Sequence, residues 1–215
     1  MNLLSYNSPL IRFFERVFEL IVLNLLTLLL CVPLFTAGGA MTALHATLFD
    51  MRQQKGRAVK GYLQAFKKEF KPALPLGFLC VLALIAYGAY LYLLYPALSA
   101  EAGWAWVAVS ALGALFFFPM SFVFPLYAKF QNSVRLTVVN AFLMSVKHIF
   151  VTLLVLLMNF VPVACLLLVP SWTAYIVLVW LFIGVSLPAY LASGLFLRVF
   201  GKYAPLEPAV MSNDD

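Results

Sequence analysis

The chain has 215 residues, of which 65% are hydrophobic and 10% are charged, and its formal net charge is +6. A soluble domain of average composition has roughly 25% charged residues, so this chain cannot cover a water-facing surface and must lie in lipid. The length fits a single integral membrane domain over 1–215 and leaves little for a second. The basic residues lie between apolar runs, where positive-inside orientation and anionic lipid explain them without nucleic acid.

Charge-free intervals locate the membrane spans, because a Lys, Arg or Asp at mid-bilayer costs about 2.5 to 3.5 kcal/mol. A span needs about 20 residues, so three of the four long intervals hold one helix each and the last, 148–197, holds two. The sequence therefore predicts an all-α, polytopic membrane helical bundle of five transmembrane helices, placed near 18–36, 74–96, 104–126, 150–169 and 173–197.

Two segments between the spans predict short amphipathic helices on the cytoplasmic face, near 37–72 and 130–148. Within the first, the stretch from 37 to 49 is uncharged but too short to cross, so it is expected to be a short or re-entrant helix at the membrane face. Thr36 is its predicted N-cap, with the hydroxyl accepting a backbone N–H of the first turn.

The distribution of Lys and Arg predicts the orientation. Twelve basic residues fall in segments that share one side of a five-helix arrangement, and only Arg12 and Arg16 fall on the other. The positive-inside rule then places the N-terminus outside and the C-terminus in the cytoplasm. Four lysines form the basic face of the helix expected over 59–70, where they are predicted to contact anionic headgroups or the acidic surface of a partner: Lys60, Lys67, Lys68 and Lys71.

Asn24 and Asn159 are amides within otherwise apolar spans. Leaving an amide unpaired in lipid costs a few kcal/mol, so each is expected to face a partner helix or a cavity, with contact between helices favoured over a ligand. Pro33 and Thr36 shape a turn after the first span. Gly38 and Gly39 are predicted to allow close helix packing there, and no phosphate-binding pattern surrounds them.

His45 and His148 are the only histidines, and both lie near the predicted cytoplasmic interface. A pH-sensing role is one interpretation, and a simple interfacial hydrogen bond is the favoured one. No metal site is predicted, because a shared site needs further ligands, and the isolated cysteines indicate neither zinc nor a disulfide framework. Nothing indicates a cofactor. His45 with Asp50 and Arg52 is the nearest approach to a catalytic cluster.

The segments at 24–45 (NLLTLLLCVPLFTAGGAMTALH) and 61–74 (GYLQAFKKEFKPAL) carry a family resemblance. Together they resemble the YesL family of bacterial integral membrane proteins (domain of unknown function 624), whose members share an Asn-Leu-Leu span, a Pro-x-x-Thr-x-Gly turn and a Phe-x-x-x-Phe-Lys helix. The matching positions are Pro33, Thr36 and Gly38 in the turn and Tyr62, Phe66 and Phe70 in the helix. The resemblance is good over 10–80 and looser afterwards.

The resemblance implies a multi-pass protein of the bacterial cell membrane, often encoded beside sugar ABC transporters and glycan-degrading enzymes. It implies no catalytic residues. The expected function is therefore non-enzymatic, as an accessory to carbohydrate uptake or membrane complex assembly, with an ABC sugar transporter as a candidate partner. The alternative is a small-molecule transporter or channel in its own right, and a membrane enzyme is a third, less favoured hypothesis.

Overall fold

The computed structural model describes residues 9–55, 57–99 and 103–203, and every regular element in this part of the chain is a helix. The α-helices are α1 (Pro9–Cys31), α2 (Ala37–Arg52), α3 (Ala58–Ser99), α4 (Gly103–Phe130), α5 (Val134–Lys147), α6 (Ile149–Leu168), α7 (Thr173–Ile183) and α8 (Ser186–Phe200). Short 3-10 turns at Leu34–Thr36 and Pro170–Trp172 precede α2 and α7. The described chain is all-α, and α4 and α6 lie within a few residues of their predicted spans.

Three helices are long and apolar enough to cross a membrane by themselves: α3, α4 and α6. Helices α7 and α8 pass the same test only as a pair, with a bend of 53° between them. The chain is thus a multi-pass membrane protein in which the described residues provide three spans, or four with the bent pair. The predicted first span, 18–36, is not among them. Helix α1 ends at Cys31, and its N-terminal half carries charged residues.

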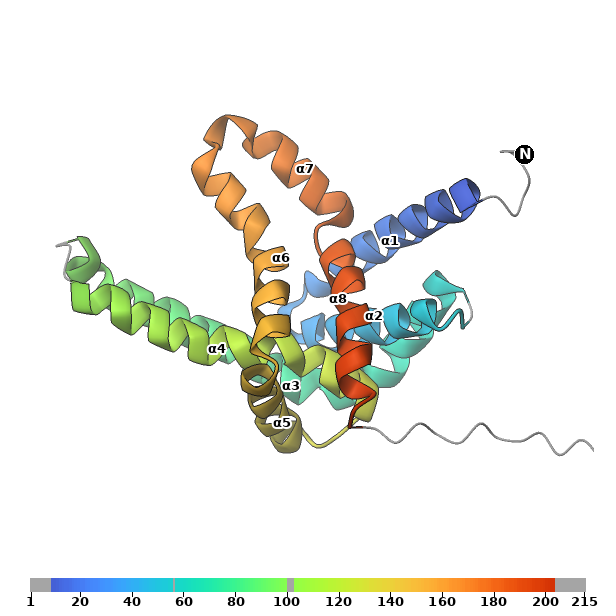
Figure 1. Ribbon diagram of the computed structural model, residues 1–215, viewed down its shortest axis with the longest axis horizontal. Helices are drawn as coiled ribbons and strands as arrows, with labels where there is room; N and C mark the ends of the chain where they lie inside the picture. The colour runs from blue at the N-terminus through green and yellow to red at the C-terminus, as the bar shows by residue number, and fades with distance from the viewer. Residues whose placement is uncertain (1–8, 56, 100–102, 204–215) are drawn as a thin grey trace, which may run out of the picture.

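Two helical hairpins diverge from a common base (Figure 1). Helices α3 and α4 run side by side to one tip, α6 and α7 form the other hairpin, and α2 lies with α8 where the hairpins meet. In the most apolar window of each span, 17% of the residues are buried in α3, 22% in α4 and 11% in α6. Most of the span surface is therefore free to contact lipid or another membrane protein.

Helix α3 corrects the prediction of a separate cytoplasmic helix followed by a span near 74–96. It is one continuous helix of 42 residues that passes through Pro72 and Pro75. A proline removes one backbone hydrogen bond and weakens a helix, but neighbouring elements can hold the two halves in line. Ala73 and Leu76, between and beside the prolines, are fully buried against other helices. Tertiary packing therefore overrides the local tendency of the two prolines to end the helix.

Helix α2 is the buried centre of the fold, where the sequence predicted a surface helix at the membrane face within 37–72. Most of its side chains are buried, and it contacts α1, α3, α4 and α8. A surface helix needs a polar face, and this segment has no charged residue before Asp50. Its small residues instead let other helices approach from several sides. Helix α5, in the second predicted amphipathic segment, packs mainly against α4.

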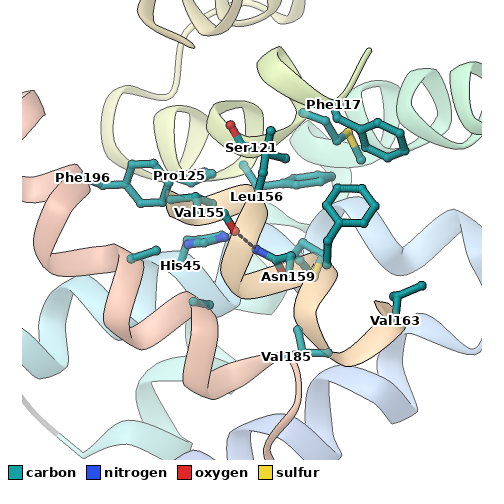
Figure 2. Close-up of a pocket in the computed structure, with 16 residues that line it drawn as sticks. His45, Phe117, Ser121, Pro125, Val155, Leu156, Asn159, Val163, Val185 and Phe196 are labelled. Carbon is teal, nitrogen blue, oxygen red and sulfur yellow. Dashed lines mark hydrogen bonds between the residues drawn. The ribbon is translucent and has the colours of Figure 1, made fainter. Parts of the chain in front are cut away.

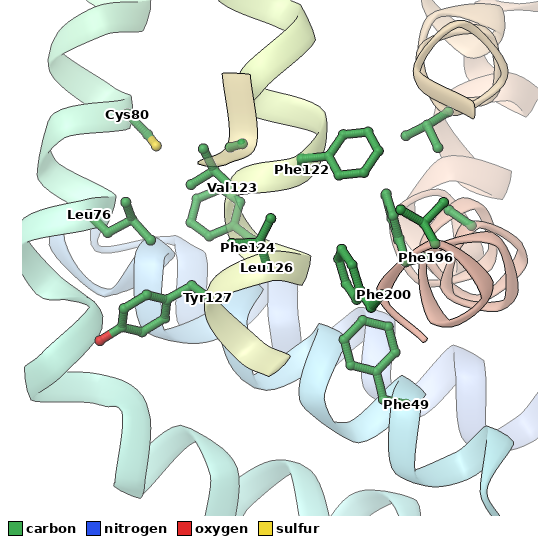
Figure 3. Packing of buried hydrophobic residues seen from close by; sticks show 14 of the residues in the cluster. Phe49, Leu76, Cys80, Phe122, Val123, Phe124, Leu126, Tyr127, Phe196 and Phe200 are labelled. Carbon is green, nitrogen blue, oxygen red and sulfur yellow. The ribbon is translucent and has the colours of Figure 1, made fainter. Parts of the chain in front are cut away.

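Aromatic side chains from α2, α4 and α8 form the core on one side of α2 (Figure 3). The rings of Phe122 and Phe196 meet edge to face with centroids 5.0 Å apart, and Phe49 meets Phe200 in the same way at 6.2 Å. A second cluster on the other side of α2 joins it to α1 and to the start of α3, through Leu20, Leu23, Leu44, Leu48 and Tyr62. Both clusters fix the position of α2.

Candidate functional site

The chain reverses direction between α1 and α2 through an apolar turn. Three hydrophobic side chains project from it with more than half of their surface exposed: Val32, Leu34 and Phe35. The predicted capping role of Thr36 is wrong, because its hydroxyl makes no bond to the first turn of α2. It donates instead to the backbone carbonyl oxygens of Leu30 and, at 2.7 Å, Pro33. The end of α1 leaves carbonyls without partners, and in an apolar setting a local donor must satisfy them.

Two glycines bring α2 and α3 into backbone contact directly after this turn. A Cβ atom on Gly38 would lie 2.6 Å from the Cα of Gly77 and 2.6 Å from the carbonyl oxygen of Ala73. A Cβ on Gly39 would lie 3.1 Å from the Cα of Phe70. Small residues permit this approach between membrane helices. Sequence reasoning identified Gly38 and Gly39 but missed Gly77, because only the fold shows which residue faces them.

Asn24 occupies the break between α7 and α8. Its side-chain amide is fully buried, and Nδ2 donates to the carbonyl oxygen of Leu181 at 2.7 Å and, less closely, to that of Trp180 at 3.4 Å. Its Oδ1 accepts the backbone N–H groups of Val185 and Ser186, both at 2.8 Å. One amide thus pairs the last carbonyls of one helix and the first amides of the next.

The predicted span 173–197 is corrected by this break. Helix α7 ends at Ile183, α8 begins at Ser186, and the Ser186 hydroxyl donates to the carbonyl oxygen of Leu20 in α1 at 2.8 Å. Gly184 and Pro188 were the available signals, since glycine commonly follows a helix and proline favours a first turn. The hydropathy profile alone did not reveal the break between α7 and α8, because the whole segment is apolar.

Arg52 ties the end of α2 to α8, a contact that sequence reasoning missed. Its Nε donates to the Ser193 hydroxyl at 2.8 Å, an Nη donates to the carbonyl oxygen of Tyr190 at 2.6 Å, and the guanidinium lies 4.4 Å from the centre of the Tyr190 ring. Asp50 is exposed and His45 is buried. The three residues considered as a catalytic cluster are therefore engaged in separate surroundings.

His45 and Asn159 line one cavity of about 300 Å³ between α2, α4, α6 and α8 (Figure 2). His45 is 7% exposed, and its Nδ1 is buried without a hydrogen-bond partner among the described residues. Its ring lies between Phe49 and Phe196, with centroids 6.3 Å and 6.2 Å away. Asn159 donates only to the carbonyl oxygen of Val155 in its own helix, at 2.8 Å. Asn24 is not among the lining residues.

His148 lies apart from this cavity, between α5 and α6. Its Nε2 is 2.9 Å from the hydroxyl of Tyr203, just beyond α8, and Lys147 lies 5.0 Å from the centre of the same ring. Partial burial lowers the pKa of His148, and the positive charges of Lys202 and Lys147 lower it further. His148 thus joins α5 to the end of α8 and, with His45, forms no shared site.

The four predicted contact lysines are all exposed along the start of α3. Lys60 and Lys67 line an open groove with Arg57 and with two acidic residues of α1, Glu15 and Glu19. The predicted orientation places Glu15 and the basic segment on opposite membrane faces, about 30 Å apart. The groove brings the N-terminal half of α1 beside the basic start of α3.

Glu69 is a buried carboxylate that sequence reasoning also missed. It is 5% exposed, accepts the side-chain N–H of Gln131 at 2.7 Å and lies 3.7 Å from the Lys68 ammonium. Gln131 directly follows the end of α4, so this pair joins the N-terminal part of α3 to the end of α4 at the base of their hairpin. The available signal was that Glu69 is the only acidic residue among the lysines of this segment.

The comparisons with known proteins bear on the first three helices. Residues 20–91 match the model of a family described as protein of unknown function, DUF624. No curated protein and no solved structure matches the chain significantly. The matched segment contains Asn24, the Pro33 turn, all of α2 and the contact between Gly38 and Gly77. Residues 20–91 are therefore similar to the DUF624 family, the family that the sequence motifs of this chain resemble.

Proposed function

We propose that this protein is a non-enzymatic accessory or assembly factor of the bacterial plasma membrane, and that it binds a transmembrane helix of a carbohydrate transporter. The resemblance to the YesL family supports the link to carbohydrate uptake, because genes of that family often lie beside those of sugar ABC transporters. The observation that carries the proposal is an apolar groove on the α6–α7 hairpin.

This groove has a volume of about 640 Å³ and lies between α6, α7 and α8. It is lined almost entirely by hydrophobic side chains, among them Leu157, Val161, Cys165, Ile176, Val179 and Leu187. In lipid, apolar character alone drives no association, and van der Waals fit decides which helices pair. A concave apolar groove beside a span with few buried residues offers that fit to one further helix, and lipid chains are the competing occupant.

Co-purification tests the proposal. The tagged protein, extracted in a mild detergent, is expected to enrich the membrane subunits of a sugar transporter over an unrelated membrane protein bait. Val179→Trp fills the groove from a side chain that is 59% exposed and is expected to reduce this enrichment about tenfold, equivalent to ~1.4 kcal/mol.

Leu93→Trp is the matched control, because Leu93 is 76% exposed on the other hairpin and lies outside the groove. It should leave the enrichment unchanged. If no transporter subunit is enriched, or if both tryptophan variants behave alike, the groove does not bind such a partner.

The cavity at His45 favours a second candidate, a small-molecule transporter or channel. Its lining includes the amide of Asn159 within α6, so a polar group does lie inside the membrane-embedded part of the chain. Under this candidate the protein acts alone. Failure of co-purification together with uptake that depends on this protein would favour it.

We further propose a topology in which α1 and α2 form a re-entrant hairpin and both ends of the described chain lie in the cytoplasm. The groove that Glu15 shares with Arg57 supports it, as does the exposed apolar turn at Val32, which belongs in lipid rather than water. All 14 Lys and Arg residues then lie on one side, in better agreement with the positive-inside rule than twelve against two.

Cysteine labelling tests this topology. In a background without the native cysteines, Trp104→Cys at the α4 tip is expected to react with an impermeant maleimide in right-side-out spheroplasts. Leu10→Cys and Lys55→Cys should react only after the membrane is opened, because both lie on the cytoplasmic side. Reaction of Leu10→Cys in sealed spheroplasts would restore an external N-terminus.

A further inference from the structure

The cavity between α2, α4, α6 and α8 combines a mostly apolar wall with a few hydrogen-bonding groups. Its polar lining consists of His45, Ser121 and Asn159, and the remaining lining residues are hydrophobic. Its volume of about 300 Å³ is roughly ten times that of a water molecule in the liquid and reaches the lower end of small-molecule sites. The cavity is thus large enough for a compact organic ligand.

The polar groups leave both acceptors and a donor for a ligand. Ser121 and Asn159 each donate to a carbonyl of their own helix, to Phe118 at 2.7 Å and to Val155 at 2.8 Å. The Ser121 oxygen and the Asn159 carbonyl oxygen remain able to accept, and the second N–H of the Asn159 amide remains able to donate. His45 Nδ1 is buried without a partner, and such an atom costs free energy until a ligand or water pairs it.

The absence of charged side chains from the described lining of the cavity indicates which class of ligand it can bind. No charged side chain is among its described lining residues, so a buried ionic ligand would have no counterion and would be strongly disfavoured. His45 itself is neutral in this apolar setting, because burying an unpaired charge is costly. The matching ligand is uncharged and mostly apolar, with a hydroxyl group that can donate one hydrogen bond and accept another.

We propose that this cavity binds a small, uncharged alcohol, whose hydroxyl pairs with His45 and Asn159 while its apolar part contacts Met41, Phe117 and Phe196. Figure 2 shows the His45 ring and the Asn159 amide directed toward one another across the cavity. The site is separate from the proposed partner groove, which lies on the other face of α6 and contains Leu157 and Val161. Ligand binding and partner docking can therefore succeed or fail independently.

Imidazole nitrogen resonances report directly on this site, because the chain has only two histidines. Histidine-selective ¹⁵N labelling of the full chain in lipid nanodiscs gives signals from His45 and His148. Benzyl alcohol is expected to shift the His45 resonances saturably. Toluene, which has a similar shape and no hydroxyl, should not produce that shift. His148 is the internal reference, since its Nε2 is paired with Tyr203 outside the cavity.

Asn159→Leu provides the variant test. Because the Asn159 amide bonds only within its own helix, the variant is expected to fold and to bind benzyl alcohol about tenfold more weakly. Ser110→Ala is the matched control, since Ser110 bonds only within α4 and lies outside the cavity. Equal shifts with toluene, equal shifts at His148, or no saturable shift would each overturn the proposal.

Discussion

Replacing Gly77 by alanine is expected to destabilise the protein by about 3 kcal/mol, at the upper end of overpacking effects. The added Cβ would lie 2.7 Å from the Cα and the N of Gly38. Both are backbone atoms, so no side chain can rotate away, and α2 must separate from α3. For a chain of this size the melting temperature in detergent should fall by about 6–12 °C, measured by intrinsic fluorescence.

Gly88→Ala in the same helix is the control for this change. A Cβ at Gly88 meets nothing within 4 Å, so only helix propensity changes, by no more than about 1 kcal/mol. Comparable losses at Gly77 and Gly88 would show that α2 and α3 do not meet at the Gly38 contact.

Replacing Asn24 by leucine is expected to cost about 3 kcal/mol. The change leaves the carbonyl oxygen of Leu181 and the N–H groups of Val185 and Ser186 without partners inside the protein, and each buried unpaired group costs about 1–3 kcal/mol, partly relieved by relaxation. The local readout is amide hydrogen exchange. Val185 and Ser186 should exchange faster, while amides in the middle of α4 are unchanged.

Asn159→Leu is the matched control for Asn24, because it removes an amide from another apolar helix. Within the described part of the chain its amide bonds only to Val155, four residues earlier, so the stability should change by less than about 1 kcal/mol. If both leucine variants lose stability equally, the cost reflects any amide within a span rather than the repair of the α7–α8 break.

The segment that matches the family model contains residues from both of these contacts. Residues 20–91 include the Asn24 side chain and the turn that ends at Gly38, while the groups they contact lie partly outside, in α7 and α8. The first three helices form a unit that positions other helices.

Much of the architecture could be predicted from the sequence. Composition requires a membrane protein, and the charge-free intervals found α4 and α6 to within a few residues, because desolvating a charge is the largest local energy term in a bilayer. The same logic failed for the segment 173–197 and for α3. The break between α7 and α8 leaves no mark in the hydropathy profile, because the distant Asn24 pairs the backbone groups at the two helix ends. In α3, a proline does not end the helix, because the residues on either side of it are packed against other helices.

The candidate site was only partly predictable. His45 and Asn159 stood out as polar residues in apolar surroundings, but their shared cavity depends on how α2 and α6 pack. Arg52, Glu69 and Gly77 gave weak signals or none, since their roles are defined by partners 141, 62 and 39 residues away.

The sequence by itself determined that this protein lies in lipid and is all-α. It also identified the segment that resembles a known family and the polar residues that must find hydrogen-bond partners in lipid. The tertiary structure decided which partner each one found. It also placed α2 at the buried centre of the fold, in contact with α1, α3, α4 and α8. The physical reason is the distance along the chain over which each effect acts. The free energy of transferring a residue into lipid depends on that residue and its sequence neighbours. Hydrogen-bond pairing and backbone contact depend on helices that are far apart in the sequence.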